Sequence, residues 1–88
     1  DEDHEQAAAF YRQAARRGVV TAMTRLGQLL HNGDGVPLNR KEALAWFLKA
    51  ARQGDAEAAN FLGVCYHQGL GTQPNPRLAR RWFLRAAQ

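Results

Sequence analysis

The side chains that could support metal or redox chemistry are one cysteine and a recurring histidine. Cys65 is the only cysteine, so an intrachain disulfide and a multi-cysteine metal site are impossible. His31 and His67 stand 36 residues apart, and histidine is a common zinc ligand. Only Glu57 falls on the same predicted helix face to join them, so a four-ligand site stays incomplete. We therefore predict no metal site.

The spacing of the polar residues does not indicate an enzyme. A nucleophilic Cys65 needs a base close by, and His67, two residues later, points to a different side of a helix. The Gly-x-Gly turns at 33–35 and 69–71 are not phosphate loops, because no Gly-Lys-Ser/Thr follows and helices precede them. We predict no catalytic residue and no cofactor.

Composition places the 88-residue chain among single soluble domains. Its 45% hydrophobic content excludes a disordered chain, and no run approaches the ~18 apolar residues of a membrane span. Four acids, Asp1, Glu2, Asp3 and Glu5, cluster at the start, whereas from Gln6 onward twelve Lys or Arg face four acids. Such a basic body favours acidic partners. The lack of a disulfide is compatible with both the cytoplasm and the periplasm.

The chain repeats itself with a period of 36 residues. A shift of that length overlays 20–52 on 56–88 without a gap and gives thirteen identities in 33 positions. The same shift backward relates Phe10 and Tyr11 to Trp46 and Phe47. A period in this range is typical of stacked helical units. We divide the single domain, 1–88, into a half unit at 1–18 and two units at 19–54 and 55–88.

Each unit is predicted to contain two antiparallel helices. The first, A, spans about 20–32 and 56–68, with an apolar stripe at spacings of three and four residues. Gly33 and Gly69 end these helices, since glycine tolerates the left-handed conformation. The second, B, begins at Asn39 and Asn75, which suit a helix N-cap. A further B helix over about 5–17 brings the total to five in an all-α fold.

The B helices alternate large aromatic residues with alanines. Small alanines let helix axes approach to roughly 8–9 Å. Trp46 and Trp82 are then expected to fill the wider gaps, each burying on the order of 200 Å². Truncation of either tryptophan should cost about 3–5 kcal/mol.

These residues resemble the Sel-one-like repeat (SLR) family of tetratricopeptide (TPR)-like helical solenoids. The motif in the second unit comprises Ala58, Leu62, Gly63, Tyr66, Gly69, Gly71, Ala79, Trp82, Ala86 and Ala87. The first unit carries Ala22, Leu26, Gly27, Gly33, Gly35, Ala43, Trp46, Ala50, Ala51 and Gly54. The resemblance covers about 7–88. It implies a right-handed α-α superhelix, an adaptor role in binding proteins or peptides, and a bacterial source.

The A helices carry a second, mostly uncharged polar face. In solenoids of this kind, the A helices line the concave surface, so we expect this face to contact a protein or peptide. Its residues, taken opposite Leu26 and its counterpart, are Thr21, Thr24, Gln28, His31, Asn32, Glu57, Asn60, Val64, His67 and Gln68. Val64 is expected to be its one exposed apolar anchor. The alternative is a solvated surface without a partner.

The B helices carry most of the cations. They are Arg12, Arg16, Arg17, Lys41, Lys49, Arg52, Arg77, Arg80, Arg81 and Arg85. Their simplest role is to keep the chain soluble and to complement the helix dipoles. The alternative is a convex basic ridge that binds a polyanion, either nucleic acid or an anionic membrane. Nucleic acid is the less favoured ligand, since no recognition motif accompanies the cations.

The predicted solenoid leaves an apolar face open at each end. No A helix in this sequence covers Phe10 and Tyr11, and none follows the last B helix. Open faces are typical of a part of a longer array or of molecules that stack end to end. We therefore expect possible self-association.

Overall fold

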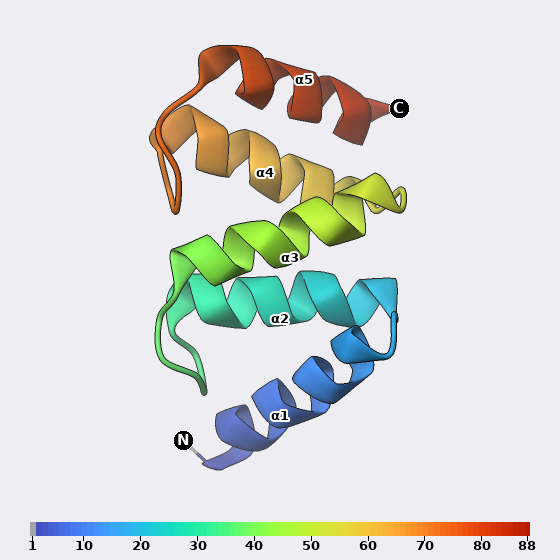
Figure 1. Ribbon diagram of the computed structural model, residues 1–88, viewed down its shortest axis with the longest axis vertical. Coiled ribbons are helices and arrows are strands. Elements are labelled where there is room, and N and C mark those ends of the chain that lie inside the picture. Colours follow the sequence, from blue (N-terminus) through green and yellow to red (C-terminus); the bar gives the residue numbers. More distant parts are fainter. Residues whose placement is uncertain (1) are drawn as a thin grey trace.

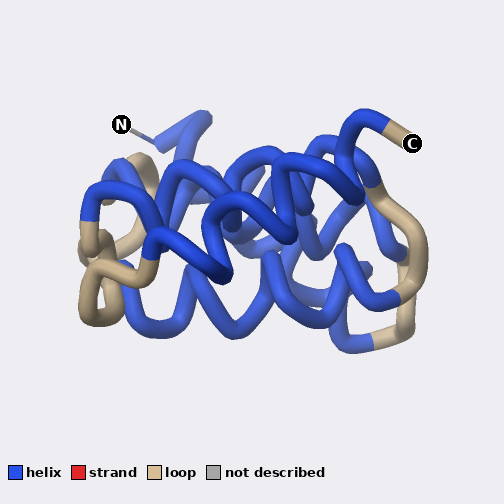
Figure 2. The backbone as a smooth tube through the Cα atoms, turned by 90° about the horizontal axis from the view of Figure 1, so that it is seen from above, coloured by secondary structure: helices blue, strands red, loops and turns tan. Residues whose placement is uncertain are grey.

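The computed structural model describes residues 2–88 and therefore leaves Asp1, one of the four clustered acids, outside. In this range the chain forms five helices and no strand, which confirms the predicted all-α solenoid. The helices are α1 (Glu2–Arg16), α2 (Val20–Asn32), α3 (Arg40–Arg52), α4 (Ala56–Gln68) and α5 (Pro76–Ala87). They stack in chain order along the longest dimension, and the connecting loops gather at two opposite sides (Figures 1 and 2).

Side-chain caps start three of the helices. Asn39 accepts a hydrogen bond from the Glu42 amide, Asn75 accepts one from the Leu78 amide, and both have extended backbones. Asp55 accepts from the Ala58 amide in the same way. Helix α1 begins at Glu2, three residues before the predicted start. Acidic residues in its first turn favour this longer helix, because they face the positive end of the helix dipole.

Glycines close both A helices, as predicted. Gly33 and Gly69 adopt left-handed backbones with φ of 67° and 74°. The next glycine of each turn, Gly35 or Gly71, packs against the backbone of His4 or Arg40, where a Cβ atom would collide with a carbonyl oxygen. Each Gly-x-Gly turn therefore packs onto the first residues of the preceding B helix, and this contact holds successive units together.

Phe47 is the centre of the core. It is fully buried, packs over Gly27 and stacks on Phe61 of the next A helix with ring centroids 4.9 Å apart. Trp46 and Trp82 lie only half-buried at the edge of the core. The tryptophans thus pack against the core, but Phe47 and not a tryptophan takes its centre. Phenylalanine takes that position because the facing glycine leaves room for a flat ring without a polar atom.

Candidate functional site

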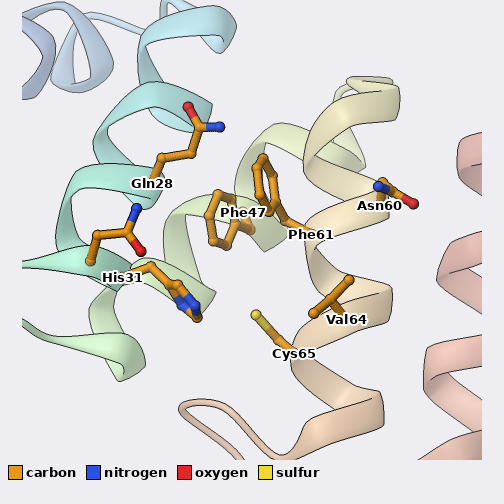
Figure 3. Close-up of a pocket in the computed structure, with 8 residues that line it drawn as sticks. Gln28, His31, Phe47, Asn60, Phe61, Val64 and Cys65 are labelled. Carbon is orange, nitrogen blue, oxygen red and sulfur yellow. The ribbon is translucent and has the colours of Figure 1, made fainter.

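A pocket of about 200 Å³ lies between α2 and α4 (Figure 3). Its floor is apolar, and Phe47 from α3 and Phe61 from α4 contribute their stacked rings. Its other lining residues are Gln28, His31, Asn32, Asn60, Val64 and Cys65. The 36-residue repeat explains why the pocket forms here, because it aligns the same faces of the A helices α2 and α4 on either side of the B helix α3.

Five of the ten residues predicted for the A-helix face line this pocket. They are Gln28, His31, Asn32, Asn60 and Val64. Val64 is half-buried, so it is less open than the exposed anchor expected from the sequence. Thr21, His67 and Gln68 are exposed but lie outside the pocket.

His31 holds a buried nitrogen without a partner at the pocket wall. No described atom forms a hydrogen bond with its Nδ1. Burial, together with the positive charge of Arg40, lowers the pKa of His31 below its ordinary value of 6.5. The imidazole is therefore neutral at pH 7 and can exchange one hydrogen bond with an incoming group without bringing a charge.

Cys65 sits opposite this histidine. Its sulfur points across the pocket toward His31 (Figure 3). Burial raises the pKa of the Cys65 thiol, so the sulfur stays protonated and weakly reactive at neutral pH. Cys65 therefore forms a chemically unreactive part of the pocket wall.

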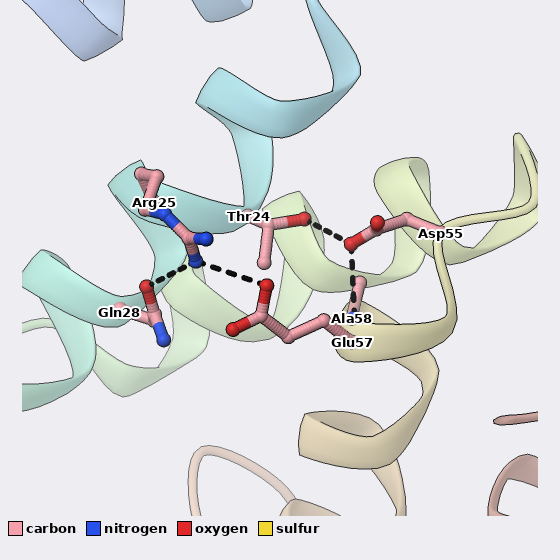
Figure 4. Close-up of polar contacts among 6 residues, drawn as sticks. All are labelled: Thr24, Arg25, Gln28, Asp55, Glu57 and Ala58. Carbon is pink, nitrogen blue, oxygen red and sulfur yellow. Dashed lines mark hydrogen bonds and ion pairs between the residues drawn. The ribbon is translucent and has the colours of Figure 1, made fainter.

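Arg25 organises the polar residues at one end of the A-helix face (Figure 4). Its guanidinium donates to Gln28 Oε1 at 2.9 Å and to Glu57 Oε1 at 3.0 Å. Glu57, predicted to face a partner, is therefore already paired across α2 and α4. Arg25 and Glu57 stand 32 positions apart in the chain, so no pattern within a single helix could indicate this ion pair.

Thr24 corrects the predicted surface. It is buried, and its hydroxyl donates to Asp55 Oδ2 at 2.6 Å, the same oxygen that caps α4 (Figure 4). The prediction considered one helix alone and therefore treated Thr24 as exposed. It did not take into account Asp55 at the start of the following unit. Thr24 is therefore a structural residue and does not face a partner.

The sequence did not predict that aromatic rings and a thiol line a binding pocket. The predicted binding face did not include Phe47, Phe61 or Cys65, although all three line the pocket. Their helix positions gave no signal of a pocket, because its depth depends on how far apart α2 and α4 are held.

The B helices present a different surface chemistry. Arg12 of α1 donates to Glu42 Oε2 of α3 at 2.8 Å, and the indole of Trp46 donates to the same oxygen at 3.2 Å. Lys49 lies over the Trp46 ring at 5.7 Å, and Arg85 lies over the Trp82 ring at 5.0 Å. Such cation–ring contacts orient the basic side chains along the helix.

Within residues 2–88, no group of three or more His, Cys, Asp or Glu side chains gathers into a candidate metal site. Over the same range, no helix is both long and apolar enough to cross a bilayer.

Comparison with known proteins agrees with the repeat geometry. The Sel1 repeat model matches residues 1–19, 20–55 and 56–88. The chain belongs to the Sel1 repeat family. Members of the family are commonly protein-interaction modules and are typically non-catalytic. No curated protein sequence matches the chain.

Two solved Sel1 repeat structures are similar to the chain. A protective antigen from uropathogenic Escherichia coli, with an SLR fold, is 35% identical over 94% of the chain, with a TM-score of 0.92. A Sel1 repeat protein from Oxalobacter formigenes is 38% identical over 94%, with a TM-score of 0.88. The matches span 18% and 34% of those chains, so the present Sel1 repeats correspond to a minor part of each. Both organisms are bacteria.

Proposed function

We propose that this Sel1 repeat domain is a non-catalytic adaptor that binds a peptide segment of a partner protein in the pocket between α2 and α4. The observation that carries the proposal is the pocket itself, where an apolar floor is bordered by uncharged polar groups. An apolar side chain of the peptide would occupy the floor, and the amides of Asn32 and Asn60 would hydrogen-bond to its backbone. The neutral imidazole of His31, which also lines the pocket, adds one further contact.

Charge supports a neutral peptide segment at this position. None of the eight pocket-lining residues is acidic or basic apart from His31, whose lowered pKa keeps it neutral. A charged side chain would lose its hydration there without gaining a counter-charge. The peptide is therefore expected to place an uncharged residue in the pocket.

A peptide-library selection on the immobilised domain tests the proposal. Each selected peptide is retested against a pocket variant, Asn60→Ala with Val64→Glu, and against Ala45→Glu. The control adds the same charge at an exposed α3 residue outside the pocket. We expect the pocket variant to bind at least about tenfold more weakly and the control to bind normally. Equal binding to both variants would place the site elsewhere.

We also propose that the domain is divided into units 1–18, 19–54 and 55–88. We further propose that it can associate with a second copy through the faces at its two ends. Phe10 on α1 is 67% exposed and Leu84 on α5 is 56% exposed, which supports an apolar contact. Sedimentation at increasing concentration should show dimers that Phe10→Glu weakens. A monomeric mass at every concentration would contradict self-association. The comparisons give no support to the polyanion alternative.

A further inference from the structure

Two equivalent tryptophans on the B helices have different polar surroundings. The 36-residue shift places Trp46 on Trp82, Lys49 on Arg85 and Glu42 on Leu78. In the α3 copy, the Glu42 carboxylate accepts hydrogen bonds from the Trp46 indole and from Arg12. In the α5 copy, leucine stands at the position of this carboxylate. The second copy therefore keeps the indole donor and lacks the acceptor, and Leu48 stands at the position of Arg12.

The α5 copy forms a shallow hollow of about 120 Å³. Leu78, Arg81, Trp82 and Arg85 line it, at spacings that put all four on one helix face. Arg85 lies over the Trp82 ring, and Arg81 adds a second guanidinium that the α3 copy lacks, since Ala45 takes that position. Two arginines and the Trp82 side chain therefore border the same hollow.

No carboxylate of the described chain neutralises these arginines. Among residues 2–88, Arg81 and Arg85 take part in no ion pair, and the Trp82 indole donates no hydrogen bond. The four acids after Gln6 are engaged elsewhere: Asp34 with His4, Glu42 with Arg12, Asp55 with Thr24, and Glu57 with Arg25. The hollow thus has unmatched positive charge.

A longer repeat array would leave this face open. In the α3 copy, Ala45 and Lys49 remain exposed although α4 and α5 follow in the chain. By the repeat relation, the counterparts Arg81 and Arg85 occupy a surface that a following unit does not cover. The face is therefore distinct from the stacking surface of the solenoid.

We propose that this α5 face binds a glutamate or aspartate side chain of a partner protein. The carboxylate accepts from the Trp82 indole and the two guanidiniums, and so takes the role that Glu42 performs within the chain on α3. Charge-assisted hydrogen bonds of this kind are stronger than neutral ones, and an arginine fork matches a carboxylate geometrically. The site is independent of the pocket between α2 and α4, so the two proposals can fail separately.

The two indole N–H signals in a ¹H–¹⁵N NMR spectrum give a direct readout, since the chain has two tryptophans. They are assigned with Trp46→Phe, and the protein is titrated with a blocked tetraglutamate peptide. We expect the Trp82 signal to move and the Trp46 signal to stay. A blocked tetraglutamine peptide should move neither. A stationary Trp82 signal with tetraglutamate would overturn the proposal.

Two variants separate a built site from general attraction to positive charge. Arg81→Gln with Arg85→Gln should weaken tetraglutamate binding at least about tenfold, while Arg17→Gln with Arg52→Gln removes the same charge from exposed positions elsewhere and should change it little. Equal losses of tetraglutamate affinity in both variants would contradict the proposed site. A short single-stranded RNA that moves the Trp82 signal and binds more tightly than tetraglutamate would also contradict it.

Leu78→Glu tests the repeat relation without any ligand. It restores the carboxylate of the α3 copy, four residues before Trp82, as Glu42 stands before Trp46. We expect the free variant to show a displaced Trp82 indole signal and to lose tetraglutamate binding. If circular dichroism shows that this variant is unfolded, the arginine variants alone decide the proposal. A folded variant that still binds tetraglutamate would refute it.

Discussion

The two complete units place the same ring in the same position and bury it to different extents. Phe47 of the first unit is fully buried, whereas its counterpart Phe83 is 37% exposed, although each packs over a glycine of its own A helix. The difference arises from the next helix, because Phe61 of α4 stacks on Phe47 and no described residue stacks on Phe83. Burial in this fold is thus completed by the following unit.

The starts of the two units differ in the opposite direction. Asp55 caps α4 and also accepts from Thr24 of the preceding unit. Val19, at the equivalent position before α2, forms no cap, although its backbone angles of −75° and 110° nearly equal the −76° and 112° of Asp55. The first unit therefore has the stronger core contact and the second has the stronger helix start.

Removal of the two rings should give the largest and most unequal effects. Phe47→Ala leaves a cavity in the core and should lower the free energy of unfolding by about 3–5 kcal/mol. Phe83→Ala should cost about 2 kcal/mol, because much of that ring is already in water. Denaturant unfolding followed by circular dichroism measures both. Equal costs would show that the following unit contributes nothing to burial.

Loss of the Asp55 carboxylate should have the next largest effect. Asp55→Ala removes the α4 cap and leaves the buried Thr24 hydroxyl without its acceptor, for a combined cost of about 2–3 kcal/mol. The same unfolding measurement on Thr24→Val and on the double variant completes a thermodynamic cycle. Additive costs would mean that the 2.6 Å contact between the units carries no coupling.

Addition of the missing cap should produce a smaller, stabilising change. Val19→Asp places a carboxylate on a backbone that already has the geometry of the Asp55 cap, so α2 should gain about 1 kcal/mol. The increase is measured as a higher denaturant midpoint at constant slope. Val19→Leu is a matched control that should leave the midpoint nearly unchanged. No gain with aspartate would indicate that the two helix starts differ beyond the cap.

The smallest expected effect is a pH dependence confined to the first unit. The hydrogen bond from Arg12, aided by the one from Trp46, lowers the pKa of Glu42 below its ordinary 4.5, and burial opposes this shift only in part. A lowered pKa in the folded state stabilises the protein above pH 4.5 and is lost as the pH falls through the folded value.

Unfolding of the wild type and of Glu42→Gln should therefore differ by less than about 1 kcal/mol at pH 7, because the pair is partly exposed. The difference should shrink as the pH falls below 4.5. A constant difference across this range would show that the Glu42 carboxylate contributes nothing through its charge.

The sequence was sufficient for the fold because its signals are local. Terminal glycines, asparagine caps and helical spacing depend on a few neighbouring residues, and the 36-residue repeat presents each of these signals twice. The start of α1 was placed three residues too late because the acids there were interpreted only as a charge cluster. The central position of Phe47 was not predicted, because Gly27, which leaves room for its ring, lies on another helix.

The candidate site could be predicted only in part, because it depends on contacts between units. The face of a single helix located Asn60 and His31, but it could not show that Asp55 of the next unit covers Thr24. It also could not show that Arg25 reaches Glu57 32 positions away. Pocket depth depends on the separation of α2 and α4, which no local pattern encodes.

The most direct test of the peptide-binding pocket is a methyl NMR titration with a peptide selected on the wild-type domain. The chain has four valines, and only Val64 lines the pocket, so Val19, Val20 and Val36 are internal controls. The proposal predicts that the Val64 methyl signals move on binding while the other three stay in place. Binding that leaves Val64 unchanged and moves another valine would contradict it.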